Sequence, residues 1–375
     1  MTKVLIFIDW YYPASKAGGP ISSVLNMVNL LHKNFDFFIV TGSKDLNSQN
    51  NLQDVILNNW QSVGFAKVIY LDNKYQKIKK LKEVVNKIKP DIIYVNGIFS
   101  RFFSVLPIYL FDNYYSIIVN PRGMFGEGAL EIKKIKKLFF IFFTRIFSFY
   151  KNVIWHVSNI NEYNQLVTNL NSKIRFYISP NIPRQIHFYK KQKNEQNLKL
   201  ISVGRVCKIK NFEFLIKLLS KVDFQCELSI IGPIEESNYF NFLQKSIQKL
   251  PKNIKVRFTG LLEKNQLDQE IINSDLLIST SLNENYGHSI VEALAYGRPV
   301  LISEFCPWDG LSDLNAGYRL PLDINLFLAK LILFAKMDNK TYSSYNYGAR
   351  NYYEKFILTE NLKNTYIDLL NNTIK

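Results

Sequence analysis

Cysteine is scarce in this chain of 375 residues, which contains only Cys207, Cys226 and Cys306. Three widely separated cysteines argue against a disulfide framework, and their spacing does not match a zinc site. The sequence also lacks an apolar run of about 18 residues, so we expect no transmembrane helix. It shows no signal-peptide cleavage site, and its N-terminus begins directly with a strand pattern. These absences predict a cytoplasmic protein with reduced thiols.

Acidic residues are the second shortage, because 31 Asp and Glu stand against 47 Lys and Arg and give a formal net charge of +16. Such an excess is typical of proteins that bind nucleic acid, a membrane surface or an anionic substrate. It also fits a genome-wide compositional bias, since Lys, Asn, Ile, Phe and Tyr are all abundant. The hydrophobic share of 47% is ordinary for a globular protein, and the length allows two domains.

Two common fingerprints are missing as well. The turn after the first strand contains Gly18 and Gly19 but not GxGxxG, so dinucleotide binding is only weakly indicated. No DxD-type metal motif stands in a fitting place. We therefore expect neither a metal ion nor a resident cofactor.

Short apolar runs alternate with helical patterns along the chain, and this order predicts an α/β fold with parallel sheets and helices on both faces. A Pro-rich segment at 180–183 separates two such series. The predicted strands are 3–8, 35–41, 68–71, 91–95, 116–119 and 152–157 in the first series, and 200–203, 227–231, 255–259, 276–278 and 300–303 in the second. Helices are predicted at 21–32, 74–89, 159–170 with Ser158 as its cap, 212–221, 289–296 and 359–370. In such sheets ligands bind beyond the carboxyl ends of the strands.

The stretch 275–299, DLLISTSLNENYGHSIVEALAYGRP, combines a strand, a polar turn with a glycine, and a helix start. Free backbone N–H groups and the helix dipole at such a start favour a bound anion. The stretch also carries Glu284 before the helix and Glu292 inside it, and carboxylates are natural partners of ribose or sugar hydroxyl groups. It therefore predicts a ligand that is both phosphorylated and rich in hydroxyl groups.

A second loop supplies the positive charge that such a ligand needs. Arg205 and Lys210 follow the first strand of the second series and lie five residues apart. A guanidinium group forks onto phosphate oxygens, while an ammonium group acts as a point charge. Together they can hold a diphosphate at the mouth of the sheet.

These segments, in this order, resemble the retaining GT-B glycosyltransferases of family GT4, the glycosyl transferases group 1. The resemblance rests on GRVCKIKN (204–211), IIGP (230–233), FTGLL (258–262) and ENYGHSIVEALAYGRPV (284–300), which is similar to the family's E-x7-E motif. AGGP (17–20) and VSNINEY (157–163) also fit the family. NPRGMFGEGAL (120–130) resembles a segment of members that build bacterial surface polysaccharides. The resemblance covers nearly all of the chain.

The resemblance implies a GT-B fold, in which two doubly wound Rossmann-like domains face each other across a cleft. Residues 1–180 would form an N-terminal acceptor-binding domain, onto which residues 356–375 cross back. Residues 181–355 would form a C-terminal domain that binds the nucleotide-sugar donor. Hinges are then expected near 180–183 and 351–355.

The resemblance also implies a role for individual residues. Arg205 and Lys210 would bind the donor diphosphate and stabilise its charge as it leaves. Glu284 would contact the donor sugar or the reacting face, and Glu292 would bind the ribose. The remaining donor-binding residues would be Gly204, Leu261, Leu262, Tyr286, Gly287, His288 and Ser289. The acceptor-binding residues would be Gly18, Gly19, Asn96 and Arg122.

The implied activity is retaining transfer of a sugar from a nucleotide-sugar, with UDP as the expected nucleotide, to a lipid-linked or polysaccharide acceptor. The setting would be lipopolysaccharide, capsule or exopolysaccharide synthesis at the inner face of a bacterial membrane. Two departures from the family's pattern stand out. Asn96 replaces a histidine of many members, and an amide cannot titrate near neutrality. His288 stands where the family often has an apolar residue, and it is expected either to contact the donor sugar or to pack.

The segment 131–151, EIKKIKKLFFIFFTRIFSFYK, is basic in its first half and aromatic in its second. A helix of this composition can lie in an anionic membrane interface. It can equally be a helix packed within the N-terminal domain, with its lysines on the wet face. The sequence leaves both interpretations open.

Two other classes of function are weighed against the transferase. A nucleotide-sugar epimerase would share the two-domain architecture, but the carboxylates and histidines of its catalytic loops are not found convincingly. A nucleic-acid-binding protein is suggested only by the charge of +16, and no binding motif accompanies it. We therefore expect no nucleic-acid partner.

Overall fold

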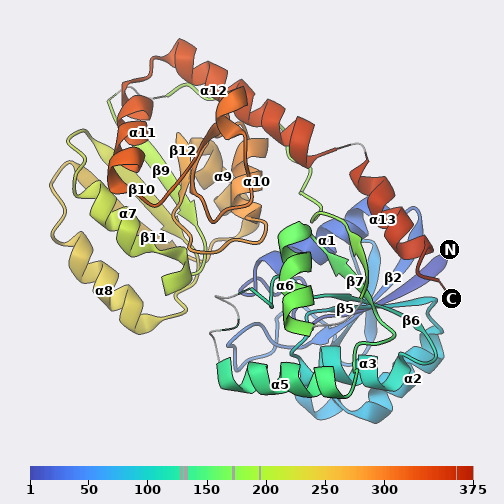
Figure 1. Cartoon of the computed structure of the whole chain (residues 1–375). Coiled ribbons are helices and arrows are strands. Elements are labelled where there is room, and N and C mark those ends of the chain that lie inside the picture. The colour runs from blue at the N-terminus through green and yellow to red at the C-terminus, as the bar shows by residue number, and fades with distance from the viewer. Residues whose placement is uncertain (127–129, 131–133, 171–173, 194–195, 360, 375) are drawn as a thin grey trace. The chain divides into compact units, whose positions relative to one another are not determined.

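The computed structural model describes residues 1–126, 130, 134–170, 174–193, 196–359 and 361–374. The chain divides into two compact units, Met1–Ile182 with Glu360–Lys375 and Pro183–Thr359 (Figure 1). The chain therefore leaves the first unit two residues later, and returns to it four residues later, than the sequence predicts. Residues 356–359 stay with the second unit because η5 (Tyr353–Ile357) continues α12 (Asn339–Tyr352) and buries Ile357.

The sheet of the first unit has eight strands in the order β3-β4-β2-β1-β5-β6-β7-β8. Its neighbouring strands pair in parallel, except that β3 is antiparallel to β4. The strands are β1 (Thr2–Phe7), β2 (Phe35–Gly42), β3 (Trp60–Val63), β4 (Ala66–Leu71), β5 (Ile92–Asn96), β6 (Ser116–Asn120), β7 (Ile154–Val157) and β8 (Arg175–Ile178). The described helices are α1 (Gly19–Leu31), α2 (Ile78–Ile88), α3 (Leu106–Phe111), α5 (Lys134–Ile146), α6 (Ile160–Leu170) and α13 (Leu362–Asn371).

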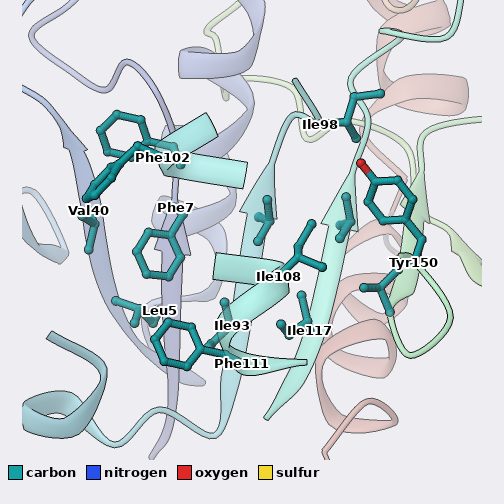
Figure 2. Close-up of a cluster of buried hydrophobic side chains, with 14 of the residues drawn as sticks. Leu5, Phe7, Val40, Ile93, Ile98, Phe102, Ile108, Phe111, Ile117 and Tyr150 are labelled. Atoms are coloured by element: carbon teal, nitrogen blue, oxygen red, sulfur yellow. The ribbon is translucent and has the colours of Figure 1, made fainter. Parts of the chain in front are cut away.

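Alternate side chains of this sheet face two separate cores, as the period of two along a strand requires. Leu5 and Phe7 point into one core beside Ile108 and Phe111 of α3 (Figure 2). Apolar residues of α2, α5 and α6 also enter this core. Val4 and Ile6 point into the other, which α1 and α13 cover. Helix α13 thus belongs to the first unit, where the Tyr366 hydroxyl donates to the Pro180 carbonyl at 3.0 Å.

The sheet of the second unit has six parallel strands in the order β11-β10-β9-β12-β13-β14. The strands are β9 (Leu198–Val203), β10 (Cys226–Ile231), β11 (Ile254–Gly260), β12 (Leu276–Ser279), β13 (Val300–Ser303) and β14 (Gly317–Leu320). The helices are α7 (Phe212–Leu219), α8 (Ser237–Ile247), α9 (Lys264–Asn273), α10 (His288–Ala295), α11 (Ile324–Lys336) and α12. One core holds Leu200 and Ile230 against α7, α8 and α11, and the other holds Ile201 and Ile231 against α10 and α12.

Both sheets reverse their strand order once, and each reversal leaves two neighbouring strands whose chains depart in opposite directions. In the first unit these strands are β1 and β5, and in the second they are β9 and β12. The loops at the carboxyl ends of such strands diverge and leave room for a ligand. Gly18 and Asn96 follow or end the first pair, whereas Lys210 and Glu284 follow the second. Parallel topology therefore puts these four predicted residues at the reversal points of their own units.

Some elements differ from the sequence-based expectation. The predicted cap of α6 was wrong by one residue, because the Asn159 side chain accepts the Glu162 N–H at 2.9 Å. Ser158 instead donates its own N–H and hydroxyl to the Glu162 carboxylate, each at 2.7 Å. The elements with no counterpart among the predicted ones are strands β3, β8 and β14 and helices α3, α8, α9, α11 and α12. Within the basic-aromatic segment, residues 131–133 lie outside the described part, as do residues 127–129 of the NPRG segment.

Candidate active site

The loops after β9 and β12 bring Lys210 and Glu284 together in an ion pair between the Lys210 ammonium and the Glu284 carboxylate. Each of the two side chains is 19% exposed, so the pair is half-buried but open to solvent. Backbone contacts fix the two loops to each other. The Leu282 N–H donates to the Ile209 carbonyl at 2.8 Å, and the Thr280 hydroxyl donates to the Asn211 carbonyl at 3.0 Å. Residues 74 positions apart are therefore held side by side by the sheet order and by main-chain bonds.

Gly204 is required by the path of the Lys210 side chain. A Cβ atom at residue 204 would lie 2.9 Å from the Lys210 Cε, closer than carbon atoms normally approach. The Lys210 stem therefore runs across the bare backbone at the end of β9. Gly232, at the end of the neighbouring strand β10, is equally constrained, since a Cβ there would lie 2.1 Å from the Gly204 carbonyl oxygen. These two glycines let the β9 loop and the lysine lie close to the sheet edge.

Arg205 lies on the same loop but takes a different partner. Its Nη1 donates to both carboxylate oxygens of Glu235, each at 2.7 Å. The Arg205 side chain is 40% exposed and the Glu235 side chain is 29% exposed, so water reaches this ion pair freely. Both predicted phosphate cations are thus neutralised by a carboxylate, Lys210 by Glu284 and Arg205 by Glu235. The sequence interpretation included Glu284 but not Glu235, which follows IIGP in a loop rich in acidic residues.

Helix α10 begins at the predicted glycine turn. Gly287 precedes the helix with φ 74°, and a Cβ there would meet the Ile290 Cδ1 at 2.8 Å and the Glu284 Cγ at 3.2 Å. The Tyr286 ring is buried against His288 and Trp308, with ring centroids 4.7 Å and 5.3 Å away. The Trp308 indole N–H donates to the Tyr286 carbonyl at 2.7 Å. This packing holds the helix start rigidly beside Glu284, so the predicted anion site and the Lys210–Glu284 pair adjoin.

Two further donor-site predictions lie close to this helix or to the sheet edge. Ser289, in the first turn of α10, donates its hydroxyl to the Val203 carbonyl at 3.4 Å, which places the turn against the end of β9. Leu261 and Leu262 follow β11, and Leu261 is exposed. They border the same carboxyl edge of the sheet, two strands away from β9.

Glu292 occupies the second turn of α10 within a cluster of charges. Burial raises the pKa of its carboxyl group, and the neighbouring Arg184 guanidinium partly opposes that rise. Arg184 itself forks onto Asp268, with N–O distances of 3.1 and 2.7 Å, and donates to the Tyr296 hydroxyl at 2.8 Å. The cluster therefore fixes the electrostatic surroundings of Glu292. Sequence reasoning found Glu292 but missed Arg184 and Asp268, since the two lie 84 residues apart.

In the first unit Arg122 and Asn96, both predicted to bind the acceptor, contact each other directly. The Arg122 Nε donates to the Asn96 Oδ1 at 2.7 Å, and its Nη1 donates to the Asn181 Oδ1. The Arg122 N–H donates to the Asn120 Oδ1 at 3.0 Å. Arg122 is therefore engaged by three asparagines, of which Asn96 and Asn181 are almost fully buried.

A histidine that the sequence did not single out lies in the same network. His156 is fully buried on β7, and its Nε2–H donates to the Ser179 carbonyl at 2.8 Å. Its Nδ1 then accepts from the Tyr94 hydroxyl at 2.7 Å and from the Asn120 Nδ2 at 3.0 Å. Burial, with the positive charge of Arg122 nearby, lowers the pKa of His156 to about 3, so the ring is neutral. Its only sequence signal was a polar residue inside an apolar strand.

Gly18 and Gly19 lie at the start of α1, where Gly18 precedes the helix and Pro20 follows within its first turn. The described contacts do not join them to the Asn96–Arg122 network. Asp9 lies in the same loop, and burial raises the pKa of its carboxyl group against the opposing hydrogen bond of Ser100. The acceptor-binding prediction for the two glycines stays a prediction.

The described part of the chain contains no group of three or more His, Cys, Asp or Glu side chains arranged to hold a metal ion. None of its helices is long and apolar enough to cross a bilayer. The three cysteines are free and buried. Burial raises the pKa of Cys207 and Cys306 to about 11 and that of Cys226 to about 12, so none is a reactive thiolate.

Comparison with known proteins agrees with this geometry. Residues 183–312 match the family described as Glycosyl transferases group 1. An alpha-monoglucosyldiacylglycerol synthase of Streptococcus pneumoniae is 21% identical over 334 residues, which span 80% of this chain and 70% of that protein.

Solved structures show the same fold over nearly the whole chain. Sucrose-phosphate synthase from Thermosynechococcus elongatus superposes with a TM-score of 0.74 at 14% identity, covering 99% of each chain. HepE from Anabaena, in complex with UDP-glucose, has a TM-score of 0.70 at 14% identity and covers 99% of this chain and 100% of its own. WaaG, a glycosyltransferase involved in lipopolysaccharide biosynthesis, has a TM-score of 0.67 at 13% identity, covering 98% of this chain and 99% of its own.

The chain therefore has the GT-B fold, with a Rossmann-like parallel sheet in each unit. The segment that matches the glycosyl transferases group 1, residues 183–312, lies within its second unit.

Proposed function

We propose that this glycosyltransferase is a retaining enzyme that takes its sugar from a UDP-sugar. Its acceptor is a lipid-linked or polysaccharide molecule of a bacterial cell-surface glycan. The observation that carries the donor assignment is the Lys210–Glu284 pair, which lies where the strand order of the second sheet reverses. The solved complexes of HepE with UDP and with UDP-glucose support a UDP-sugar as donor. The names of WaaG and of the pneumococcal synthase support a lipid or surface-glycan acceptor.

The two carboxylate-neutralised cations explain how a diphosphate would be held. An incoming diphosphate competes with Glu284 for Lys210 and with Glu235 for Arg205, because each cation prefers the ligand with the greater local negative charge. The N-terminus of α10 adds backbone donors and a favourable dipole. As the bond between sugar and phosphate breaks, negative charge grows on the leaving group, and these fixed positive groups stabilise it without reorganisation.

Glu284 acquires a separate task once Lys210 turns to the phosphate. Its carboxylate is then released to accept a hydrogen bond from a sugar hydroxyl next to the start of α10. Glu292, deeper in the same helix, accepts from the ribose hydroxyls. Among the residues that the structure describes we identify no paired nucleophile and acid of the kind used by retaining glycosidases, so we propose same-face transfer with the leaving phosphate receiving the acceptor proton.

The first unit is proposed to bind the acceptor at the reversal point between β1 and β5. Asn96 acts there as a hydrogen-bonding group and not as a proton carrier, because its Oδ1 accepts from Arg122. Gly18 and Gly19 offer close backbone approach on the adjoining loop. We propose that transfer needs neither a metal ion nor a cofactor, since Lys210, Arg205 and the α10 dipole supply the positive charge.

The proposal is tested by turnover of UDP-sugars in three variants. Lys210→Ala and Glu292→Gln should each lower the rate of transfer or of donor hydrolysis by about 10²–10³, the usual cost of removing one fixed charge stabiliser. Lys208→Ala, two residues away on the same turn, is the matched control and should keep the wild-type rate.

The folded state of each variant is checked by its far-UV circular dichroism and melting temperature. Turnover equal to wild type in both Lys210→Ala and Glu292→Gln would contradict the assignment. Metal dependence is measured separately, with activity in excess EDTA expected to equal activity in Mg²⁺. Interconversion of UDP-sugars without acceptor, followed by NMR, would instead indicate an epimerase.

A further inference from the structure

Helix α5 turns an unusually apolar face to solvent. Only Ile141 and Thr144 of its thirteen residues are buried. The exposed large hydrophobic residues on and just after the helix are Ile135, Leu138, Phe139, Phe142, Phe143, Ile146 and Phe147. Ile135 is 78% exposed and Phe139 62%, values expected for charged side chains of a surface helix and not for aliphatic or aromatic ones.

The apolar residues form one continuous face and not a scatter. With 3.6 residues per turn, positions two apart lie on nearly opposite sides of a helix. Phe139 and Phe143 each stand two positions from the buried Ile141, so both point away from the core. The Phe143 ring contacts the rings of Phe139, Phe142 and Phe147, with centroids 5.7, 5.8 and 6.2 Å away. Monomeric soluble proteins rarely expose an apolar face of this continuity.

The opposite side of α5 is anchored firmly to the first unit. Ile141 belongs to the core that α2, α3 and α6 also enter. The Phe140 ring packs edge-on against the Phe99 ring, with their centroids 5.6 Å apart. The Lys137 ammonium lies 5.0 Å from the centroid of the Phe99 ring. Loose attachment therefore does not explain why the helix is exposed. It is held by one narrow side and presents the other.

The charges around this face decide which partner fits it. Between Glu131 and Glu162 the sequence has six basic residues, Lys133, Lys134, Lys136, Lys137, Arg145 and Lys151, and no acidic one. Lys136 and Arg145 are exposed on α5 itself. A second copy of the chain would bring like charges together, which disfavours a symmetric dimer through α5. A surface of anionic headgroups above an apolar layer satisfies the cations and the aromatic rings together.

We propose that α5 is an interfacial helix that docks the first unit on an anionic lipid bilayer. The apolar face of Phe139, Phe142, Phe143 and Ile146 lies at the boundary between headgroups and acyl chains. Lys136 and Arg145 extend along it and reach the phosphate groups, as long basic side chains do at membrane interfaces. The inference goes beyond the transfer reaction, since it concerns where the enzyme works and not what it does to its donor.

The test is co-sedimentation of the full chain with vesicles of phosphatidylcholine containing about one third phosphatidylglycerol, and with vesicles of phosphatidylcholine alone. We expect binding to the anionic vesicles and little binding to the neutral ones. Lys136→Gln/Arg145→Gln should weaken partition roughly thirtyfold, because each cation near an anionic surface contributes about fivefold. Phe139→Ser/Phe143→Ser should weaken it about tenfold or more, through lost apolar contact.

Matched controls separate α5 from general stickiness. Lys79→Gln/Lys82→Gln removes two exposed cations from α2, and Phe242→Ser/Phe356→Ser removes two exposed rings from the second unit. Both controls should bind vesicles like the wild type. A Phe143→Trp variant should also be quenched by brominated lipid if the ring enters the bilayer.

Several outcomes would overturn the proposal. Vesicle binding that is unchanged in the Phe139→Ser/Phe143→Ser variant excludes insertion by α5. A wild-type chain that ignores anionic vesicles, with a sedimentation coefficient that falls in the same variant, shows that α5 contacts a second copy instead. The protection that UDP gives the protein against thermal unfolding is measured on every variant. A variant that loses vesicle binding but is still protected by UDP therefore tests the role of α5 alone. A variant that binds vesicles but is not protected by UDP tests the proposed donor.

Discussion

The two units share one topology but fill their strand-reversal points differently. In the second unit the reversal point carries cations, each paired with a carboxylate and each open to water. In the first unit Arg122 is satisfied by asparagine amides, and a neutral His156 is bonded on both ring nitrogens. The cations of the second unit can exchange their carboxylate partners for an anionic ligand, whereas Arg122 and His156 of the first unit are held by uncharged partners. The strand-order reversal that both sheets share thus sets where a site lies, while the residue types decide what it can do.

This contrast predicts a separation of effects. Substitutions at the first reversal point should lower stability and leave UDP binding intact, because the buried groups there serve one another. Substitutions at the second should change UDP binding and leave stability nearly intact, because half-exposed ion pairs contribute little to folding. A first-unit variant that weakens UDP binding, or a second-unit variant that strongly lowers stability, would contradict the contrast between the two units.

Removing Arg122 should give the largest effect on stability. Arg122→Ala leaves the buried amide oxygens of Asn96 and Asn181 without that donor, at an expected cost of about 3 kcal/mol in the free energy of unfolding. Calorimetry of the variant measures the loss, with the exposed Arg101→Ala as its control. The UDP dissociation constant should stay at the wild-type value. A weaker UDP affinity with unchanged stability would show that Arg122 serves the donor.

Acid should destabilise the first unit through His156. Its pKa falls to about 3 in the folded chain, while an unfolded histidine has a pKa of about 6.5. Between those values only the unfolded state takes up the proton, so the stabilisation is complete above pH ~6.5 and falls as the pH drops. Lowering the pH from ~6.5 to ~5 should cost about 2 kcal/mol more in the wild type than in His156→Asn. Parallel stability curves for the two proteins would contradict the buried neutral ring.

Adding one methyl group at Gly204 should weaken donor binding without unfolding the chain. The new Cβ would meet the flexible end of Lys210, which can move aside and carry its ammonium group away from the phosphate. We expect about a tenfold rise in the UDP dissociation constant, or roughly 1.4 kcal/mol. Titration calorimetry measures it, and Gly64→Ala, where a Cβ meets open space, should leave the constant unchanged. An unchanged UDP dissociation constant for Gly204→Ala would contradict a contact between Lys210 and the donor.

The smallest expected effect concerns Glu235. Glu235→Gln removes the carboxylate that competes with phosphate for Arg205, so UDP should bind about two- to fivefold more tightly, the scale of an exposed ion pair. Glu236→Gln, the adjacent acidic residue, is the matched control. Weaker binding in Glu235→Gln would mean that the carboxylate orients Arg205 for the ligand and does not compete with it.

Local patterns predicted the elements around the proposed donor site well, and pairings between distant residues were out of reach. The strand, turn and helix between Asp275 and Pro299 are each predicted by neighbouring residues. The bounds of β12 and α10 therefore lie within one residue of the predicted ones. Glu235 was overlooked because an acidic residue in a polar loop looks like an ordinary solvated one. His156 was overlooked because one polar residue in a strand does not show what surrounds it.

The same limit explains the elements that were not expected. The strand β3 is four residues long and only partly buried, so it lacks both an apolar run and a clean alternation. The exposed face of α5 had a visible sequence signal, but its composition alone fitted a packed helix equally well. The exposures of its side chains show which residues the core leaves uncovered, and the proposal that α5 docks on a bilayer rests on them.

The most direct test of the account is the shift in melting temperature that UDP produces in the wild type, Lys210→Ala and Lys208→Ala. A ligand at about 100 times its dissociation constant adds roughly 2.7 kcal/mol to the stability of the protein that binds it. At that concentration of UDP the account predicts a large upward shift for the wild type and Lys208→Ala, and little or none for Lys210→Ala. Equal shifts in all three proteins would contradict the placement of the donor diphosphate at Lys210.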